Sequence, residues 1–193
     1  MRKRLSGVLL ALGMGGALVA FTPGAAIAAA ASGTSTATLS ATLTSGSIGT
    51  RAISSVSPGS FSSVLGNATM TSSLGVAVAE AAVGGDANWY VTGQVSQFAD
   101  STTPTPNTIP ASALANSGNS TTVVGGGGTV AEGANGALDT AQTFFTDTGE
   151  LVGTLYTGTY TNASTLTLTP PNGTIATGVA DPYTATLTVT LFT

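Results

Sequence analysis

Apolar residues alternate with threonine at a strict period of two near the end of the chain. Between positions 183 and 191, every odd position is apolar: Tyr183, Ala185, Leu187, Val189 and Leu191. Successive side chains of a β-strand point to opposite faces, so this spacing predicts a strand with one buried face. Residues 37–43 alternate in the same way. Because threonine is β-branched and favours strands, the pattern indicates a sheet protein.

Shorter patterns of this kind recur, each bounded by Gly, Pro, Asn or Asp. They predict strands at 51–56, 74–83, 88–97, 151–156 and around Leu166 and Leu168. Residues 74–83 also fit a short helix, but the alternation of Val76 and Val78 favours a strand. The sequence has no cysteine, so stability must come from a buried core. We predict an all-β fold, an antiparallel β-sandwich that is Ig-like in outline.

The first 28 residues have the pattern of a secretory signal peptide. A basic start, Arg2 to Arg4, is followed by an apolar run at 8–21 and by Ala26-Ile27-Ala28, a small-x-small cleavage pattern. The apolar run is shorter than the ~20 residues of a membrane span, which favours cleavage before Ala29 over a retained anchor. We therefore expect a secreted protein, extracellular or cell-wall associated, with one domain at 29–193 and no membrane span in its mature form.

Cleavage would leave Arg51 as the single cation. Eight acidic residues oppose it, so the formal charge of the mature chain would be −7. Nucleic-acid binding requires clustered lysine and arginine, and we expect no nucleic-acid partner. The absence of lysine and arginine clusters also argues against binding to anionic lipid surfaces.

Histidine and cysteine are both absent, which excludes a Ser-His-Asp triad and any imidazole or thiolate metal ligand. We expect no enzyme activity, no cofactor and no metal. Two alternatives use acidic residues. Glycoside hydrolysis could use the pairs Glu132 with Asp139 or Asp147 with Glu150. A calcium site could gather Asp86, Asn88 and Asp181, although turn formation explains these three residues more simply.

The region around 99–140 is rich in Gly, Pro and Thr, and we expect a flexible excursion from the sandwich there. Residues 101–108 form a stiff Pro/Thr loop, either unmodified or O-mannosylated. Residues 115–137 include four consecutive glycines, Gly125 to Gly128. They form either a long surface excursion, which we favour, or a glycine-rich crossover between strands. Because no lysine follows the glycines, a phosphate loop is not indicated.

Trp89 is the single tryptophan and lies in the stretch D-A-N-W-Y-V-T. It is either a core residue or an exposed platform for a sugar ring. Val91 and Val95 share its face of the predicted strand and Tyr90 points to the other, which favours burial. Phe98 breaks the alternation, so we expect a bulge near Gly93 or a strand end near Gln97.

Three segments occur together in a familiar order. They are N-W-Y-V-T-G-Q-V-S-Q-F at 88–98, T-I-P-A-S-A-L at 108–114, and a C-terminal pair, S-T-L-T-L-T-P-P at 164–171 and A-D-P-Y-T-A-T-L-T-V-T-L at 180–191. This order resembles the WxL-domain family and its looser relatives, secreted surface proteins of Gram-positive bacteria and actinomycetes. The resemblance covers about residues 36–193.

The resemblance implies a sandwich fold with two structural motifs. Trp89 and Val91 belong to the first motif, in which valine replaces the final leucine. Val189 and Leu191 belong to the second, in which valine stands where the family has tryptophan. In the family, the second motif has been linked with attachment to peptidoglycan.

These observations predict a non-catalytic, secreted module of the cell envelope with a structural or adhesive role. Its partner would be a cell-wall polymer or a surface glycan, bound non-covalently. The alternative is a soluble carbohydrate-binding module that uses Tyr90, Tyr156 or Tyr160.

Overall fold

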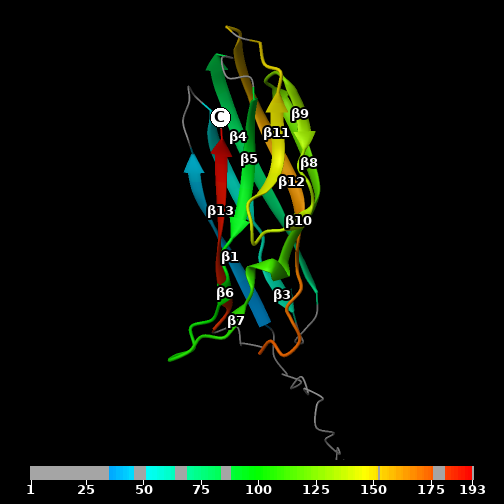
Figure 1. Cartoon of the computed structure of the whole chain (residues 1–193). Coiled ribbons are helices and arrows are strands. Elements are labelled where there is room, and N and C mark those ends of the chain that lie inside the picture. The colour runs from blue at the N-terminus through cyan, green and yellow to red at the C-terminus, as the bar shows by residue number, and fades with distance from the viewer. Residues whose placement is uncertain are drawn as a thin grey trace, which may run out of the picture.

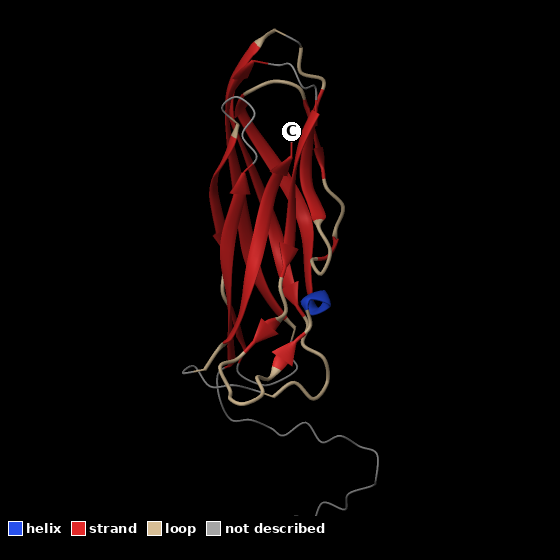
Figure 2. Cartoon of the chain, turned by 60° about the vertical axis from the view of Figure 1, so that its left-hand side comes forward, coloured by secondary structure: helices blue, strands red, loops and turns tan. Residues whose placement is uncertain are grey.

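Two β-sheets packed face to face make up the described chain (Figure 1). The computed structural model describes residues 35–45, 51–63, 69–83, 88–151, 153–175 and 181–192; the predicted signal peptide lies outside them. In these ranges the one helix is a single 3₁₀ turn, η1 (Ala111–Ala113). The strands run along the length of an elongated sandwich (Figure 2). The predicted all-β sandwich is therefore confirmed.

Sheet A has the strand order β3-β1-β13-β5-β11-β9, and the short strands β6 and β7 extend it beside β13. Its strands in chain order are β1 (Ser35–Ser45), β3 (Phe61–Ser63), β5 (Asn88–Val95), β6 (Phe98–Ala99), β7 (Thr108–Ile109), β9 (Thr129–Glu132), β11 (Gln142–Thr148) and β13 (Tyr183–Phe192).

Sheet B has the strand order β10-β8-β12-β4-β2. Its strands in chain order are β2 (Ala52–Pro58), β4 (Met70–Val83), β8 (Leu114–Gly125), β10 (Gly136–Ala137) and β12 (Leu155–Leu168). The 14-residue strands β4 and β12 pair along their whole length and form the centre of this sheet. Residues 74–83 are thus a strand, as the alternation of Val76 and Val78 predicted.

All described strand pairs are antiparallel except β1 with β13, which is parallel. Apart from the run β5, β6 and β7, consecutive strands lie in opposite sheets. The connections at the Gly, Pro, Asn and Asp residues that bound the strands therefore mostly cross from one sheet to the other. Ladder partners are far apart in the sequence, which gives the fold a high contact order and predicts slow folding.

The core lies between the sheets and follows the predicted alternation. On β13, all five odd positions from Tyr183 to Leu191 are buried. On β5, Trp89, Val91 and Val95 are buried. The strand ends at Val95, which confirms the strand end expected near Gln97.

A bulge at Phe144 of the partner strand β11 lies opposite Thr92 and Val91, next to Gly93. The register between β11 and β5 shifts between Thr143 and Phe145, so that the adjacent residues Phe144 and Phe145 are both buried. The Phe144 ring occupies the space over Gly93, where an added Cβ would lie 2.2 Å from its Cζ atom. Gly93 therefore makes room for the second phenylalanine.

The surface excursion expected within 99–140 is corrected by the structure for residues 114–137. These residues contain β8, β9 and β10, and Gly125 to Gly128 connect β8 of sheet B with β9 of sheet A. The glycine-rich crossover, the alternative interpretation, is what the structure shows. In the outer half of β8, residues 122–125 are exposed, so no apolar alternation marked the strand. Residues 101–107 do form a loop.

The short strand expected at 151–156 is also placed differently. β12 begins at Leu155 and continues without a break to Leu168. Leu151, Gly153 and Thr154 belong to a loop, in which Gly153 has φ of 80°. That left-handed conformation is incompatible with a strand.

Candidate functional site

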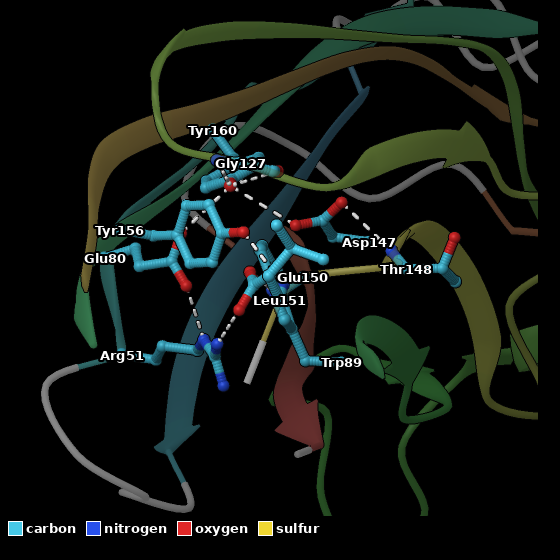
Figure 3. Close-up of polar contacts among 10 residues, drawn as sticks. All are labelled: Arg51, Glu80, Trp89, Gly127, Asp147, Thr148, Glu150, Leu151, Tyr156 and Tyr160. Atoms are coloured by element: carbon cyan, nitrogen blue, oxygen red, sulfur yellow. Dashed lines mark hydrogen bonds and ion pairs between the residues drawn. The ribbon is translucent and has the colours of Figure 1, made fainter. Parts of the chain in front are cut away.

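Six side chains meet between the sheets, at the end of the sandwich where β13 finishes. We call them the charged cluster, and Figure 3 shows them with their neighbours. Its members are Arg51, Glu80, Trp89, Asp147, Glu150 and Tyr160. It contains the single cation after residue 4 and three of the eight acids of the chain.

Strand periodicity places the ionisable members in the core. Glu80 is in step with Val76 and Val78 on β4, and Asp147 is in step with Phe145 on β11. Arg51 precedes β2 and is in step with the buried Ile53. The exposed fractions are 2 % for Arg51, 3 % for Glu80, 4 % for Glu150 and 0 % for Asp147. Burying charges is costly unless they are paired and hydrogen-bonded, so their contacts decide what the cluster does.

Arg51 joins two carboxylates from different parts of the fold. Its Nε donates to Glu80 Oε1 at 2.6 Å, and its Nη2 donates to Glu150 Oε2 (Figure 3). Glu80 lies on β4 of sheet B, whereas Glu150 follows β11 of sheet A. The guanidinium therefore connects the two sheets.

Trp89 completes this connection from sheet A. Its Nε1 donates to Glu150 Oε1 at 3.1 Å. Its ring makes edge-to-face contacts with Phe145, at 5.6 Å between ring centroids, and with Tyr160, at 4.8 Å. The Arg51 Cζ atom lies 6.0 Å from the centroid of the indole. Trp89 thus contributes an apolar surface to the core and a polar handle to the cluster.

The Tyr160 hydroxyl lies among three acceptors. Its oxygen is 2.9 Å from Glu80 Oε2, 2.9 Å from the carbonyl oxygen of Gly127 and 3.3 Å from Asp147 Oδ2, and it accepts from the Gly127 N–H at 3.0 Å. A phenol has one proton, so it cannot donate to both carboxyl groups at once. The second carboxyl can bond to the phenol only as a donor, which requires it to be protonated.

The four glycines close over the cluster. A Cβ on Gly126 would lie 2.5 Å from the Tyr160 hydroxyl, and one on Gly127 would lie 2.0 Å from the Tyr156 ring. On Gly128 it would lie 2.4 Å from Asp147 Oδ1. The glycine run is therefore explained by close backbone approach, as well as by the positive φ of Gly125, Gly126 and Gly128.

Burial changes the proton affinity of the acids in the cluster. Desolvation raises the pKa of Glu80, and the neighbouring Glu150 adds to the rise, whereas hydrogen bonds from Arg51 and Tyr160 oppose it. Desolvation also raises the pKa of Asp147, whereas hydrogen bonds from the Tyr160 hydroxyl and the Thr148 N–H oppose the rise. Three carboxyl groups face one guanidinium, so full ionisation would leave two negative charges uncompensated. The cluster therefore favours protonation of at least one acid.

The two carboxylate pairs considered for hydrolysis lie in different environments. Asp147 and Glu150 both belong to the charged cluster, where neither is open to a substrate. Glu132 is exposed and accepts hydrogen bonds from the Thr121 N–H, at 2.6 Å, and from its hydroxyl, at 3.0 Å. Asp139 is also exposed.

The calcium grouping of Asp86, Asn88 and Asp181 is not supported. Asp86 lies outside the described residues. Asn88 and Asp181 lie at opposite ends of sheet A, because Tyr90 pairs with Phe192 at the far end of β13 from Asp181. Asp181 Oδ1 instead accepts from the Ser101 N–H at 2.8 Å and from its hydroxyl at 2.6 Å, as expected of a residue that orders a loop. Within the described ranges, no three His, Cys, Asp or Glu residues are placed to hold a metal ion.

The remaining predicted residues divide between core and surface. Trp89, Val91, Val189 and Leu191 are all buried, so Trp89 is a core residue and not an exposed platform. Tyr160 is fully buried, and the Tyr156 ring packs on Gly127. Tyr90 is 39 % exposed and stacks on Phe192 with the ring centroids 4.8 Å apart.

Sequence reasoning did not group Arg51, Glu80 and Tyr160. The signal was nevertheless present, because Glu80 occupies an apolar-face position in the alternation of β4. An acid at such a position, in a chain with a single remaining arginine, indicates a buried ion pair. The partner on each strand could not be read from the sequence.

The chain matches no protein-family model, no curated protein and no solved structure. The resemblance to WxL-domain proteins therefore stays a prediction. Among the described residues, no helix has the length and apolar character needed to cross a membrane.

Proposed function

We propose that this chain is a non-catalytic, secreted module of the cell envelope with a structural or adhesive role, and that it binds a wall polymer non-covalently. One observation carries the proposal: ionisable groups are concentrated in the core, while hydroxyl groups cover the strands outside. In the described strands, the charged residues are Glu80, Glu132 and Asp147, and Glu132 alone is exposed.

The outward positions of the central strands are rows of threonine. On β13 of sheet A they are Thr184, Thr186, Thr188 and Thr190, and on β12 of sheet B they include Thr157, Thr159 and Thr161. Threonine hydroxyls both donate and accept hydrogen bonds, which suits a polymer rich in hydroxyl and amide groups. Such a surface needs no charge complementarity with its partner.

The burial and pairing of the acidic side chains support a non-catalytic role. Hydrolysis of a glycosidic bond needs two carboxyl groups that reach the substrate from either side. In the charged cluster, Glu80 and Glu150 are paired with Arg51, and Asp147 lies beneath Gly128. These groups serve to hold the two sheets together.

Cosedimentation of purified residues 29–193 with isolated Gram-positive cell walls tests the proposal. We expect retention above that of an unrelated acidic protein. Two matched variants locate the binding face: Thr188→Glu with Thr190→Glu on sheet A, and Thr159→Glu with Thr161→Glu on sheet B. We expect one pair to reduce retention and the other to leave it unchanged. Retention no greater than that of the control protein would rule out wall attachment.

The alternative is a soluble carbohydrate-binding module, and the Tyr90–Phe192 stack is the observation that favours it. These partly exposed rings lie on the outer face of sheet A, with an interplanar angle of 12°. A glycan array would give a signal that Tyr90→Ala removes and that Tyr156→Phe, a substitution away from this stack, retains. An array without signal would exclude this alternative.

A further inference from the structure

The first and last described strands are side by side and run in the same direction. β1 and β13 form nine in-register pairs, from Ala37 with Tyr183 to Ser45 with Leu191. In Figure 1 the blue arrow of β1 and the red arrow of β13 point the same way. The chain therefore enters this ladder at one end of the sandwich and leaves it at the other.

This arrangement determines how the fold responds to tension between its ends. Pulling at Ser35 and Phe192 moves β1 and β13 in opposite directions along their own axes. The evenly spaced hydrogen bonds of a parallel ladder are then loaded together. If both pulling points were at the same end of the ladder, the same hydrogen bonds would be loaded one after another.

β1 is paired less extensively than β13. β13 is held on its other side by β5, with pairs from Leu187 with Val95 to Phe192 with Tyr90. β1 has on its other side the short strand β3, which pairs with residues 35–37 alone. The ladder between β1 and β13 is therefore the first barrier to extension.

The charged cluster is the next set of contacts after β1 along the chain. Arg51 lies six residues after the end of β1. Once β1 has slid away, tension reaches Arg51, which is held by the carboxylates of Glu80 and Glu150 and is 2 % exposed. Extending the chain further requires this buried pairing to break.

We propose that the sandwich bears tension between its two ends, with the β1–β13 ladder as the first clamp and the Arg51 pairing as the second. The proposal rests on the proposed envelope function for its biological role. Resistance to tension does not depend on wall binding, so an experiment can reject either one without the other.

Single-molecule force spectroscopy tests the first clamp. Because the chain has no cysteine, engineered pairs define the pulling points. Ser35→Cys with Phe192→Cys loads the ladder lengthwise, whereas Ser45→Cys with Phe192→Cys pulls the same two strands apart from one end. We expect a severalfold higher unfolding force in the first geometry at equal pulling speed. Equal forces, or a lower force in the first geometry, would overturn the proposal.

The second clamp is tested in the Ser35/Phe192 geometry. We expect a first event that releases β1 and a second that depends on the cluster. Arg51→Met should lower the force of the second event and leave the first unchanged. Glu150→Gln, which keeps hydrogen-bonding capacity, tests the same step if the arginine variant does not fold. A second event unaffected by both substitutions would remove Arg51 from the mechanism. If residues 29–193 are not retained on cell walls but show these unfolding forces, the envelope role alone is rejected.

Discussion

Arg51 Nε lies 2.6 Å from Glu80 Oε1, with both side chains almost fully buried. This pair brings the single cation after residue 4 into the core, where Glu150 accepts a hydrogen bond from Nη2 of the same guanidinium. A guanidinium suits this position because its fixed fork of donors can bind two carboxylates at once. The charged cluster joins the end of sheet A to sheet B.

The first prediction concerns pH. The folded pKa values of Glu80 and Asp147 lie above their ordinary values of 4.5 and 3.8, so the folded state binds protons more strongly than the unfolded state. The resulting stabilisation is fully present below the ordinary values and is lost as pH rises through the folded ones. The free energy of unfolding should therefore fall as pH rises from these ordinary values through the folded ones.

Asp147→Asn tests the source of this pH dependence. The variant should have a smaller slope between these pH values and a higher relative stability at the alkaline end. Denaturant unfolding at a series of pH values measures both. A slope equal to that of the parent would show that Asp147 does not hold the proton.

The loss of stability expected at low pH has a different origin. Hydrogen bonds from Ser101 lower the pKa of Asp181. For Asp100, burial alone would raise the pKa, but hydrogen bonds from Asn107 and Thr102 lower it overall. Their stabilisation is present above pH 3.8 and is lost as pH falls through the lower folded values. We therefore expect maximum stability in mildly acidic solution.

The second prediction concerns the glycine crossover. Gly126 and Gly149 have similar φ angles, 74° and 79°, but a Cβ on Gly126 would meet the Tyr160 hydroxyl at 2.5 Å, whereas Gly149 has open space. Alanine at either position incurs roughly 1–2 kcal/mol for the left-handed conformation. Gly126→Ala should cost about 1–3 kcal/mol more than Gly149→Ala, because it also overpacks the cluster. Urea unfolding of both variants measures the difference, and equal losses would contradict close packing at Gly126.

The third prediction concerns a buried hydroxyl. Ser164 is 6 % exposed, and its Oγ has no hydrogen-bond partner among the described residues. Ser164→Ala should therefore stabilise the fold by on the order of 1 kcal/mol, because it removes an unsatisfied polar group. Ser120→Ala, at an exposed position of β8, serves as the control and should change stability by less than about 0.5 kcal/mol. A clear loss on Ser164→Ala would instead indicate a bound water at this hydroxyl.

Alternation alone could predict which faces of the strands are buried. It identified the inward row of β13 and the burial of Trp89. It missed β8, because the outer half of that strand has no buried face. Period-two patterns report the direction of a side chain and nothing about its partner strand.

The charged cluster could not be predicted for the same reason. Arg51 and Glu150 are 99 positions apart, and Trp89 and Glu150 are 61 apart. Because most consecutive strands lie in opposite sheets, the strand pairing that brings these residues together is non-local. Local sequence signals therefore describe the layers of this sandwich better than its topology.

The buried Arg51 pairing holds the two sheets together, and the free energy of unfolding of Arg51→Met at pH 7 is the sharpest test of this role. The variant leaves two carboxylates buried without their cation, so we predict a loss of about 3–5 kcal/mol relative to the parent. Asp139→Asn, which also removes one charge but at an exposed site, should change stability by less than about 0.5 kcal/mol. An Arg51→Met variant as stable as Asp139→Asn would contradict a role for Arg51 in holding the sheets together.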